Sequence, residues 1–340
     1  MTDTDSLAKK LWNFIKGRLS WHEIQAMVDE DFKIILVGKE DKVKALAKKI
    51  TGNEEFQWDE GGKLSPIFLP LEAGSREKAV DSQAIVFLLD LWQVEKEDIK
   101  SHKEWLPRRI SASWIFEGKH DVMRKEIVRG WFEELTLPEP VFIEEVEREE
   151  GKTFAPYIVS LSPNLQMAMA KNFPPLREEV ASRLIKTTSK QNLIIALASS
   201  MPANIPVIGI IFGIFSVTGE TAVLTANQVK LCLQLAAIFG RKLTFFDRMA
   251  EILPLAGGAF GWRSIAREIG GLIPGVGLVV KPTIAYSATY LTGKIACWFY
   301  EKGDKLSASE KRKIYDEAKR EAKKLIDDIT EKWKRKDQTR

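Results

Sequence analysis

The chain has 340 residues, 45% of them hydrophobic and 29% charged, with a formal net charge of +4. That length allows two domains with separate cores, and so mild a charge does not require an anionic partner. Two cysteines, Cys232 and Cys297, and three scattered histidines offer neither a disulfide framework nor metal-ligand spacing. We expect no metal site and no catalytic constellation. The first residues lack an apolar signal-peptide core, so an intracellular, cytoplasmic protein is expected.

An amphipathic helix is expected within residues 1–30, and short apolar runs then alternate with helical stretches up to residue 150. The runs expected to form strands are 32–38, 65–70, 84–90, 111–116 and 140–143. Prolines in the second run indicate an edge strand. Helices are expected between strands, at 41–50 and 122–135. This alternation predicts an α/β domain over 31–150 with a doubly wound parallel sheet, whose ligands bind at the carboxyl ends of the strands.

A partial phosphate-loop motif follows the first expected strand. The pattern is G-x-x-x-x-G-K-[ST], and residues 38–45 read GKEDKVKA. Gly38 and Lys44 match the first glycine and the lysine. Val43 replaces the second glycine, and its branched side chain lies where a phosphate must approach bare backbone. Ala45 replaces the hydroxyl that ligates Mg²⁺.

Two further windows follow later strands. Residues 71–74, Leu-Glu-Ala-Gly, keep only the glycine of an Asp-x-x-Gly motif, at Gly74. Residues 118–121, Gly-Lys-His-Asp, keep Lys119 and Asp121 of an Asn-Lys-x-Asp motif, with Gly118 in place of asparagine. In order and spacing, residues 31–150 resemble an Era- or Der-like bacterial GTPase domain with degenerate motifs. The resemblance implies that GTP or GDP is the ligand, held by Gly38, Lys44, Gly74, Lys119 and Asp121. The replaced residues argue against Mg²⁺ binding and hydrolysis.

The second half of the chain has a different composition. After an expected linker at 151–174, residues 175–303 are apolar and glycine-rich, and residues 191–219 contain no charge. Apolar helices are expected at 192–201, 224–239 and 285–293, with proline or glycine breaks at 202–206 and 271–277. A charged C-terminal helix is expected within 304–340, with apolar residues at three- and four-residue spacing. The whole chain is therefore expected to be α/β followed by all-α.

Three blocks in this half carry a second resemblance: the break at 202–206, the helix at 225–240 and the segment 273–290. In this order they resemble the YcjF-like domain of unknown function, which often lies beside bacterial GTPase domains. The resemblance implies association with a membrane. The uncharged run is longer than the roughly 20 residues that span a bilayer as a helix. Its prolines and Asn204 disfavour a simple span, and a buried helical core remains open.

The leading hypothesis is a GTPase-like regulatory or adaptor protein at the cytoplasmic face of a membrane, without hydrolytic activity. An atypical active GTPase and a soluble helical scaffold that binds no nucleotide are the alternatives. A protein partner or self-association is expected, and a membrane surface is a candidate partner through the basic residues at 332–336. Nucleic acid is not expected, because no basic surface interleaved with aromatic residues is evident.

Overall fold

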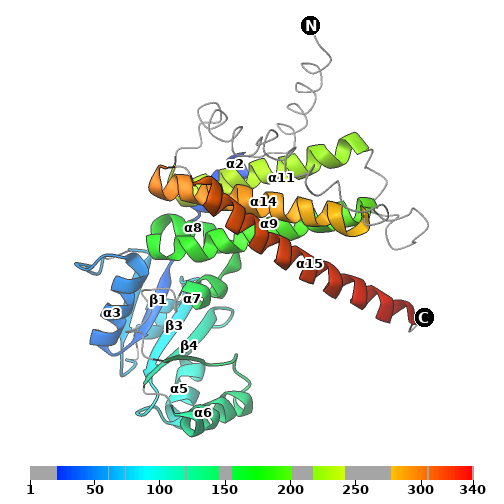
Figure 1. The fold of residues 1–340 in the computed structure, drawn as a ribbon. Coiled ribbons are helices and arrows are strands. Elements are labelled where there is room, and N and C mark those ends of the chain that lie inside the picture. The colour runs from blue at the N-terminus through cyan, green and yellow to red at the C-terminus, as the bar shows by residue number, and fades with distance from the viewer. Residues whose placement is uncertain are drawn as a thin grey trace. The chain divides into compact units, whose positions relative to one another are not determined.

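The computed structural model describes residues 21–59, 61–72, 74–118, 121–144, 155–200, 217–241, 277–304 and 306–338. They form two compact units (Figure 1). The α/β unit is Ala26–Val180, and the helical unit contains the residues from Ala181 on together with the start of α2 (Trp21–Asp29). Of the expected N-terminal helix, only α2 falls within the described residues.

The α/β unit is built on a five-stranded parallel sheet with the order β2-β1-β3-β4-β5. The strands are β1 (Ile34–Gly38), β2 (Leu64–Phe68), β3 (Ala84–Asp90), β4 (Ser111–Gly118) and β5 (Val141–Glu144). The expected parallel sheet is confirmed, and β2 with Pro66 lies at its edge. The connection from β1 leads to β2 on one side of it in the sheet. The connection from β2 then passes over β1 to reach β3 on the other side, so the direction of strand addition reverses at β1. In open α/β sheets, the crevice at such a reversal is the usual ligand site.

Helices cover both faces of this sheet. They are α3 (Glu40–Thr51), α4 (Ser75–Ala79), α5 (Lys96–Trp105), α6 (Val122–Glu134), α7 (Ala155–Leu161) and α8 (Gln166–Asn172). Phe87 and Trp114 pack against α5 and α6 residues such as Phe132 on one face. Strand residues of the opposite parity, such as Leu36 and Val86, are equally buried, and α3 contacts β1 on that side. Burial on both faces explains why the strands read as continuous apolar runs.

The segment expected to be a linker, 151–174, contains helices. It contains α7, the 3₁₀ turn Pro163–Leu165 and α8. All three belong to the α/β unit. The ring of Phe173 packs edge-on against Phe32, with 5.7 Å between ring centroids. Lys171 forms an ion pair with Asp29. The segment therefore belongs to the folded unit, because its apolar residues complete that unit's core.

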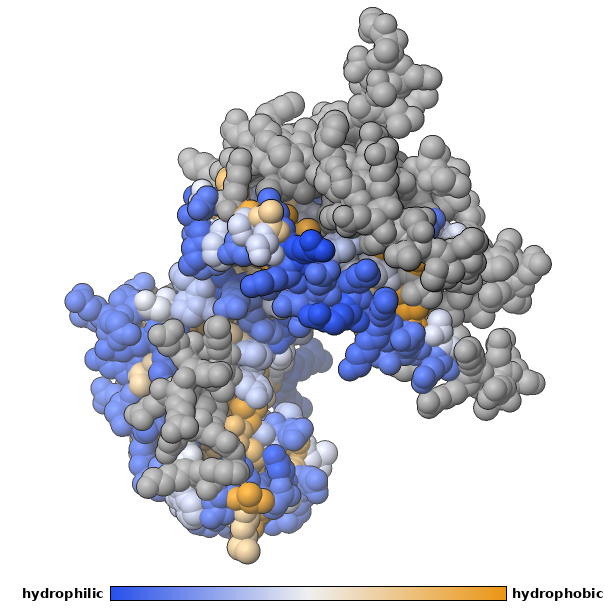
Figure 2. Space-filling model, in the orientation of Figure 1, coloured by the Kyte–Doolittle hydropathy of each residue, from blue (hydrophilic) through white to orange (hydrophobic). Residues whose placement is uncertain are grey.

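The described part of the helical unit contains four long helices, the first of which begins in the α/β unit: α9 (Arg177–Ser200), α11 (Val217–Ile238), α14 (Gly277–Lys302) and α15 (Ala308–Gln338). The helices expected at 224–239, 285–293 and within 304–340 are confirmed, and the one at 192–201 is the end of α9. Tyr286, Ala322 and Ile326 belong to the core between α14 and α15, while the outer side of α15 is hydrophilic (Figure 2). No helix within the described ranges is long and apolar enough to cross a membrane. The breaks at 202–206 and 271–276 lie outside those ranges.

A buried polar network joins three of these helices. Asn192 on α9 is fully buried, and its amide donates hydrogen bonds to Thr289 Oγ1 on α14 at 2.8 Å and to the Leu224 carbonyl on α11 at 3.3 Å. Its side-chain oxygen accepts a bond from Asn227 at 2.7 Å, and Gln228 donates to Thr289 Oγ1 at 3.1 Å. Because a buried amide is costly unless it is paired, this network favours one alignment of α9, α11 and α14.

We predict that Gly293→Ala destabilises the helical unit by roughly 1 kcal/mol. A Cβ at Gly293 would lie 2.5 Å from Ile185 Cγ1 and 3.1 Å from Leu231 Cδ2, so α9, α11 and α14 would have to move apart. Urea denaturation of the full chain measures the change. The control is Gly130→Ala on α6, where an added Cβ meets no described atom within 4 Å and the helix should gain up to about 1 kcal/mol. An equal gain in the free energy of unfolding for Gly293→Ala and Gly130→Ala would contradict the prediction.

Candidate functional site

The connection from β1 to α3 decides the shape of the sheet's carboxyl edge. β1 ends at Gly38 and α3 begins at Glu40, so Lys39 alone joins them. The positions that a phosphate-binding loop would hold open, 40–43, form the first turn of α3. A Cβ on Gly38 would lie 2.7 Å from the Leu88 carbonyl oxygen and 2.9 Å from Val43 Cγ2. Only glycine fits there, and the fully buried Val43 closes over it.

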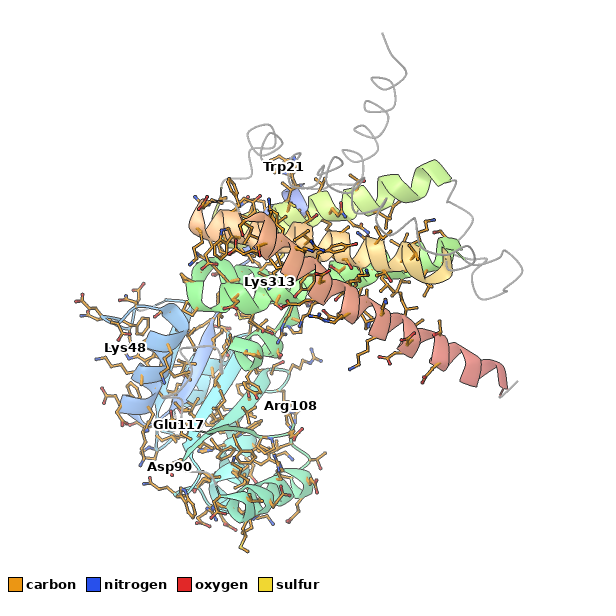
Figure 3. The ribbon with its side chains drawn as sticks, in the orientation of Figure 1. Trp21, Lys48, Asp90, Arg108, Glu117 and Lys313 are labelled. Carbon is orange, nitrogen blue, oxygen red and sulfur yellow. The ribbon has the colours of Figure 1, made fainter. Side chains whose placement is uncertain are left out.

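An ion pair spans the same edge from α3 to β4. Lys42 Nζ lies 2.8 Å from Glu117 Oε2. Glu117 is the register partner of Asp90 on β3, and the two are labelled at this edge in Figure 3. The hydrogen bond and charge of Glu117 raise the pKa of Lys42. Lys42 therefore stays charged and holds α3 to β4 across the end of β3.

Of the five residues expected to hold a nucleotide, the structure describes Gly38, Lys44, Gly74 and Asp121, and these four have different surroundings. Gly38 is buried against Leu88 and Val43, and Lys44 is exposed on α3. Gly74 precedes α4 with a right-handed helical backbone, and an added Cβ there would meet no described atom within 4 Å. Asp121 is the N-cap of α6, where Oδ1 accepts a 2.8 Å bond from the Arg124 N–H. Lys119 lies outside the described residues.

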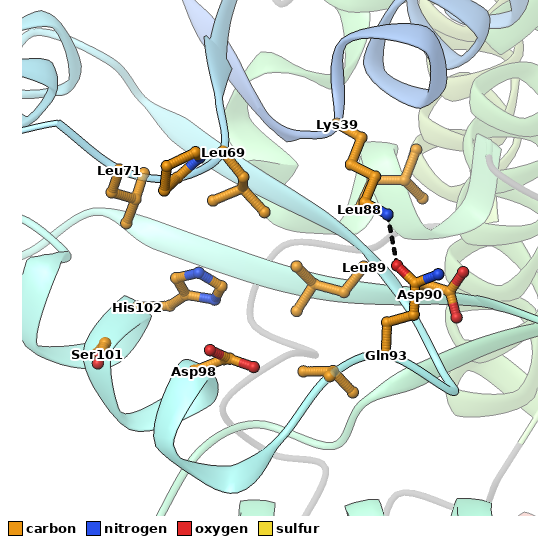
Figure 4. Close-up of a pocket in the computed structure, with 12 residues that line it drawn as sticks. Lys39, Leu69, Leu71, Leu88, Leu89, Asp90, Gln93, Asp98, Ser101 and His102 are labelled. Carbon is orange, nitrogen blue, oxygen red and sulfur yellow. Dashed lines mark hydrogen bonds between the residues drawn. The ribbon is translucent and has the colours of Figure 1, made fainter.

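A hollow of about 510 Å³ lies beside the carboxyl ends of β1, β2 and β3, on the side covered by α5 (Figure 4). Its apolar wall consists of Leu69, Pro70, Leu71, Leu88, Leu89 and Val94. Its polar groups are Lys39, Asp90, Gln93, Asp98, Ser101 and His102. An apolar wall with a few polar groups at the reversal point of a doubly wound sheet is typical of a small-molecule site. We therefore take this hollow as the candidate functional site.

The polar groups of the hollow are held by neighbouring elements. Lys39 Nζ donates a hydrogen bond to Gln93 Oε1 (Figure 4), and Asp90 Oδ1 accepts a 2.9 Å bond from the Trp92 N–H. Asp98 Oδ2 accepts a 2.9 Å bond from the Glu95 N–H, which caps α5. Among the described residues, no group of three or more His, Cys, Asp or Glu side chains could hold a metal ion.

His102 on α5 is 93% buried, since only 7% of its surface is exposed. Its ring stacks on Phe87, with centroids 5.0 Å apart and an interplanar angle of 17°. Nδ1 has no hydrogen-bond partner among the described residues. Burial lowers the pKa of His102, and the nearby Asp98 carboxylate opposes this shift in part. The imidazole is therefore neutral near pH 7.

Sequence reasoning missed Lys39, Asp98 and His102. Lys39 stands at a variable position of the phosphate-loop motif, and His102 has no recognisable motif beside it. One signal was available: Asp98 and His102 are four residues apart, the spacing that puts side chains on one face of a helix.

We predict that the α/β unit loses stability as the pH falls below 6.5, the ordinary pKa of histidine. In the folded state the pKa of His102 is lowered, so the unfolded chain binds more protons in this range and unfolding becomes easier. Urea denaturation at about pH 7.5 and about pH 5.5 measures the loss. His102→Phe keeps a ring on Phe87 and should reduce the loss. An equal loss in this variant would assign it to other groups.

We predict that Asp121→Ala costs about 1 kcal/mol of stability, because α6 loses its N-cap hydrogen bond. Asp121→Asn should cost much less, since asparagine is an equally good cap. Thermal denaturation of both variants checks the difference. Equal stability of the alanine variant and the unsubstituted chain would show that the cap contributes nothing.

Comparison with known proteins finds no matching family model, and no curated protein matches the chain.

Proposed function

We propose that this chain is a GTPase-like regulatory or adaptor protein that does not hydrolyse GTP and acts at the cytoplasmic face of a membrane. The observation that carries the proposal is the one-residue connection between Gly38 and Glu40. Polyphosphate binding in GTPases needs an open loop whose backbone N–H groups surround the phosphates. With Val43 packed on Gly38 and Lys42 paired with Glu117, the α3 side of this edge is filled by the protein's own side chains.

The electrostatics of the edge support the same proposal. Glu40 and Asp41 occupy the first turn of α3, where they offset the partial positive charge of the helix N-terminus. Ala45 offers no oxygen to Mg²⁺. We propose that any contact with GTP or GDP is weak and independent of Mg²⁺.

Exposed apolar side chains support a protein partner. Trp92 follows β3 and is 51% exposed, while Val122 and Met123 follow β4 at the start of α6 and are 64% and 75% exposed. All three residues come after the carboxyl ends of adjacent strands. Large apolar side chains gathered at one edge are typical of interaction surfaces.

The membrane part of the proposal rests on composition, namely the uncharged residues 191–219 and the basic residues at 332–336. Leu193 and Ala196, at the start of the uncharged run, are buried in the helical unit. We therefore propose association with the membrane surface, and not insertion of α9.

The test is titration of the full chain with fluorescent GTP and ATP analogues, with and without Mg²⁺, combined with an assay of phosphate release. We expect no Mg²⁺-dependent hydrolysis and no effect of Lys44→Ala, because Lys44 is exposed on α3. Mg²⁺-dependent GTP hydrolysis that Lys44→Ala abolishes would instead establish an atypical active GTPase.

Flotation with anionic liposomes tests the membrane part separately. We expect the full chain to float with these vesicles and to dissociate as the salt concentration rises. A chain that stays in the soluble fraction at low salt would support a soluble scaffold.

A further inference from the structure

Three stacked rings end at the hollow beside β1, β2 and β3. Trp114 stacks on Phe87 with centroids 5.3 Å apart and an interplanar angle of 11°, and Phe87 stacks on His102. Trp114 and Phe87 are buried in the core, whereas His102 also lines the hollow. The imidazole is thus the last ring of the stack. Stacked rings attract one another beyond the effect of their burial, so a planar ring in the hollow would extend the stack favourably.

Polar groups lie at both ends of the hollow (Figure 4). At one end, Asp98 and His102 lie one helical turn apart on α5 and both line the hollow. At the other, Lys39 is bonded to Gln93. The buried Nδ1 of His102 lacks a partner among the described residues, and an unpaired buried polar atom is destabilising. The carboxylate of Asp98 accepts one backbone bond and has capacity for more.

The charges of the hollow limit the class of ligand. Among the described residues that line it, Lys39 is the one cation, against the carboxylates of Asp90 and Asp98. A polyanion would be repelled, whereas N–H donors would be attracted to Asp98. The leucine wall requires that the remainder of the ligand be apolar or aromatic. A volume of about 510 Å³ suits a molecule of one or two rings with a small substituent.

We propose that this hollow binds an uncharged planar heteroaromatic molecule of the nucleobase or nucleoside class, stacked on His102 and donating N–H hydrogen bonds to Asp98. The proposal names the ligand of the regulatory protein proposed above and rests on that function. It places the base on the α5 side of the sheet, away from Asp121, which does not line the hollow. Binding would connect the base to β3 through Phe87 and to β1 through Lys39.

The test is titration of the ¹⁵N-histidine-labelled full chain with adenosine and with guanosine. The chain has three histidines, so the imidazole signals of His102 can be assigned by comparison with the His102→Phe variant. We expect saturable binding of at least one nucleoside, with the His102 signals shifting in proportion to occupancy. Absence of saturation by both nucleosides at about 1 mM would overturn the proposal.

Two variants locate the binding. Asp98→Asn keeps an oxygen for the Glu95 N–H but removes the charge, and we expect roughly tenfold weaker binding. Asp41→Asn, on the exposed first turn of α3, is the matched control and should bind as the unsubstituted chain does. Saturable binding that leaves the His102 signals unmoved, or that Asp98→Asn does not weaken, would overturn the assignment to this hollow.

GTP and ribose complete the set of probes. We expect GTP to bind at least about tenfold more weakly than guanosine, because its phosphates add negative charge to a hollow already lined by the carboxylates of Asp90 and Asp98, and ribose not to bind. Tighter binding of GTP than of guanosine would overturn the proposal. Mg²⁺-dependent phosphate release from GTP would contradict the proposed function. Absence of nucleoside binding would contradict the ligand proposal, so the two failures are distinguishable.

Discussion

The contact at Gly38 is the constraint on which the carboxyl edge of the sheet depends. Because the Leu88 carbonyl would lie 2.7 Å from any Cβ at this position, β1 and β3 can approach here only through a glycine. That approach brings the start of α3 directly over the strand ends and buries Val43. No length of chain is left between strand and helix for a loop that could hold phosphates. Residues 38–45, which match the phosphate-loop motif in part, are the end of β1 and the start of α3, joined by Lys39 alone.

Closure on the α3 side leaves the α5 side as the open part of the edge. The turn after β3 is anchored there by Arg124, whose guanidinium donates to the carbonyls of Leu91, at 3.0 Å, and Val94. Asp98 and Glu95 cap the start of α5. These bonds fix the backbone that presents Gln93 and Asp98 to the hollow. Arg124 and Glu95, which do not line the hollow, thus help to preorganise the candidate site, and preorganisation lowers the entropic cost of binding a ligand.

The helical unit obeys a different constraint. Its apolar helices could slide along one another at little cost, since apolar contacts have no direction. The bonds of Asn192 with Asn227 and Thr289, and the close approach at Gly293, are directional or steric and select one alignment. Residues 191–200, which read as the start of a membrane-length run, contribute Asn192 and Leu193 to this interior.

The sequence by itself determined the order of the α/β and helical parts, the parallel sheet, the edge position of β2 and the long helices. Hydrophobic periodicity and proline or glycine breaks are local properties of the chain, so they can be recognised without the tertiary structure. It could not determine the candidate site. Lys44 fits a motif yet is exposed, and Asp121 fits a base-reading motif yet caps its own helix. Lys39 and His102 line the same hollow only because the fold brings the end of β1 and α5 to the same edge of the sheet. Tertiary structure alone decided which charges face a hollow, since burial and charge pairing act between residues distant in sequence.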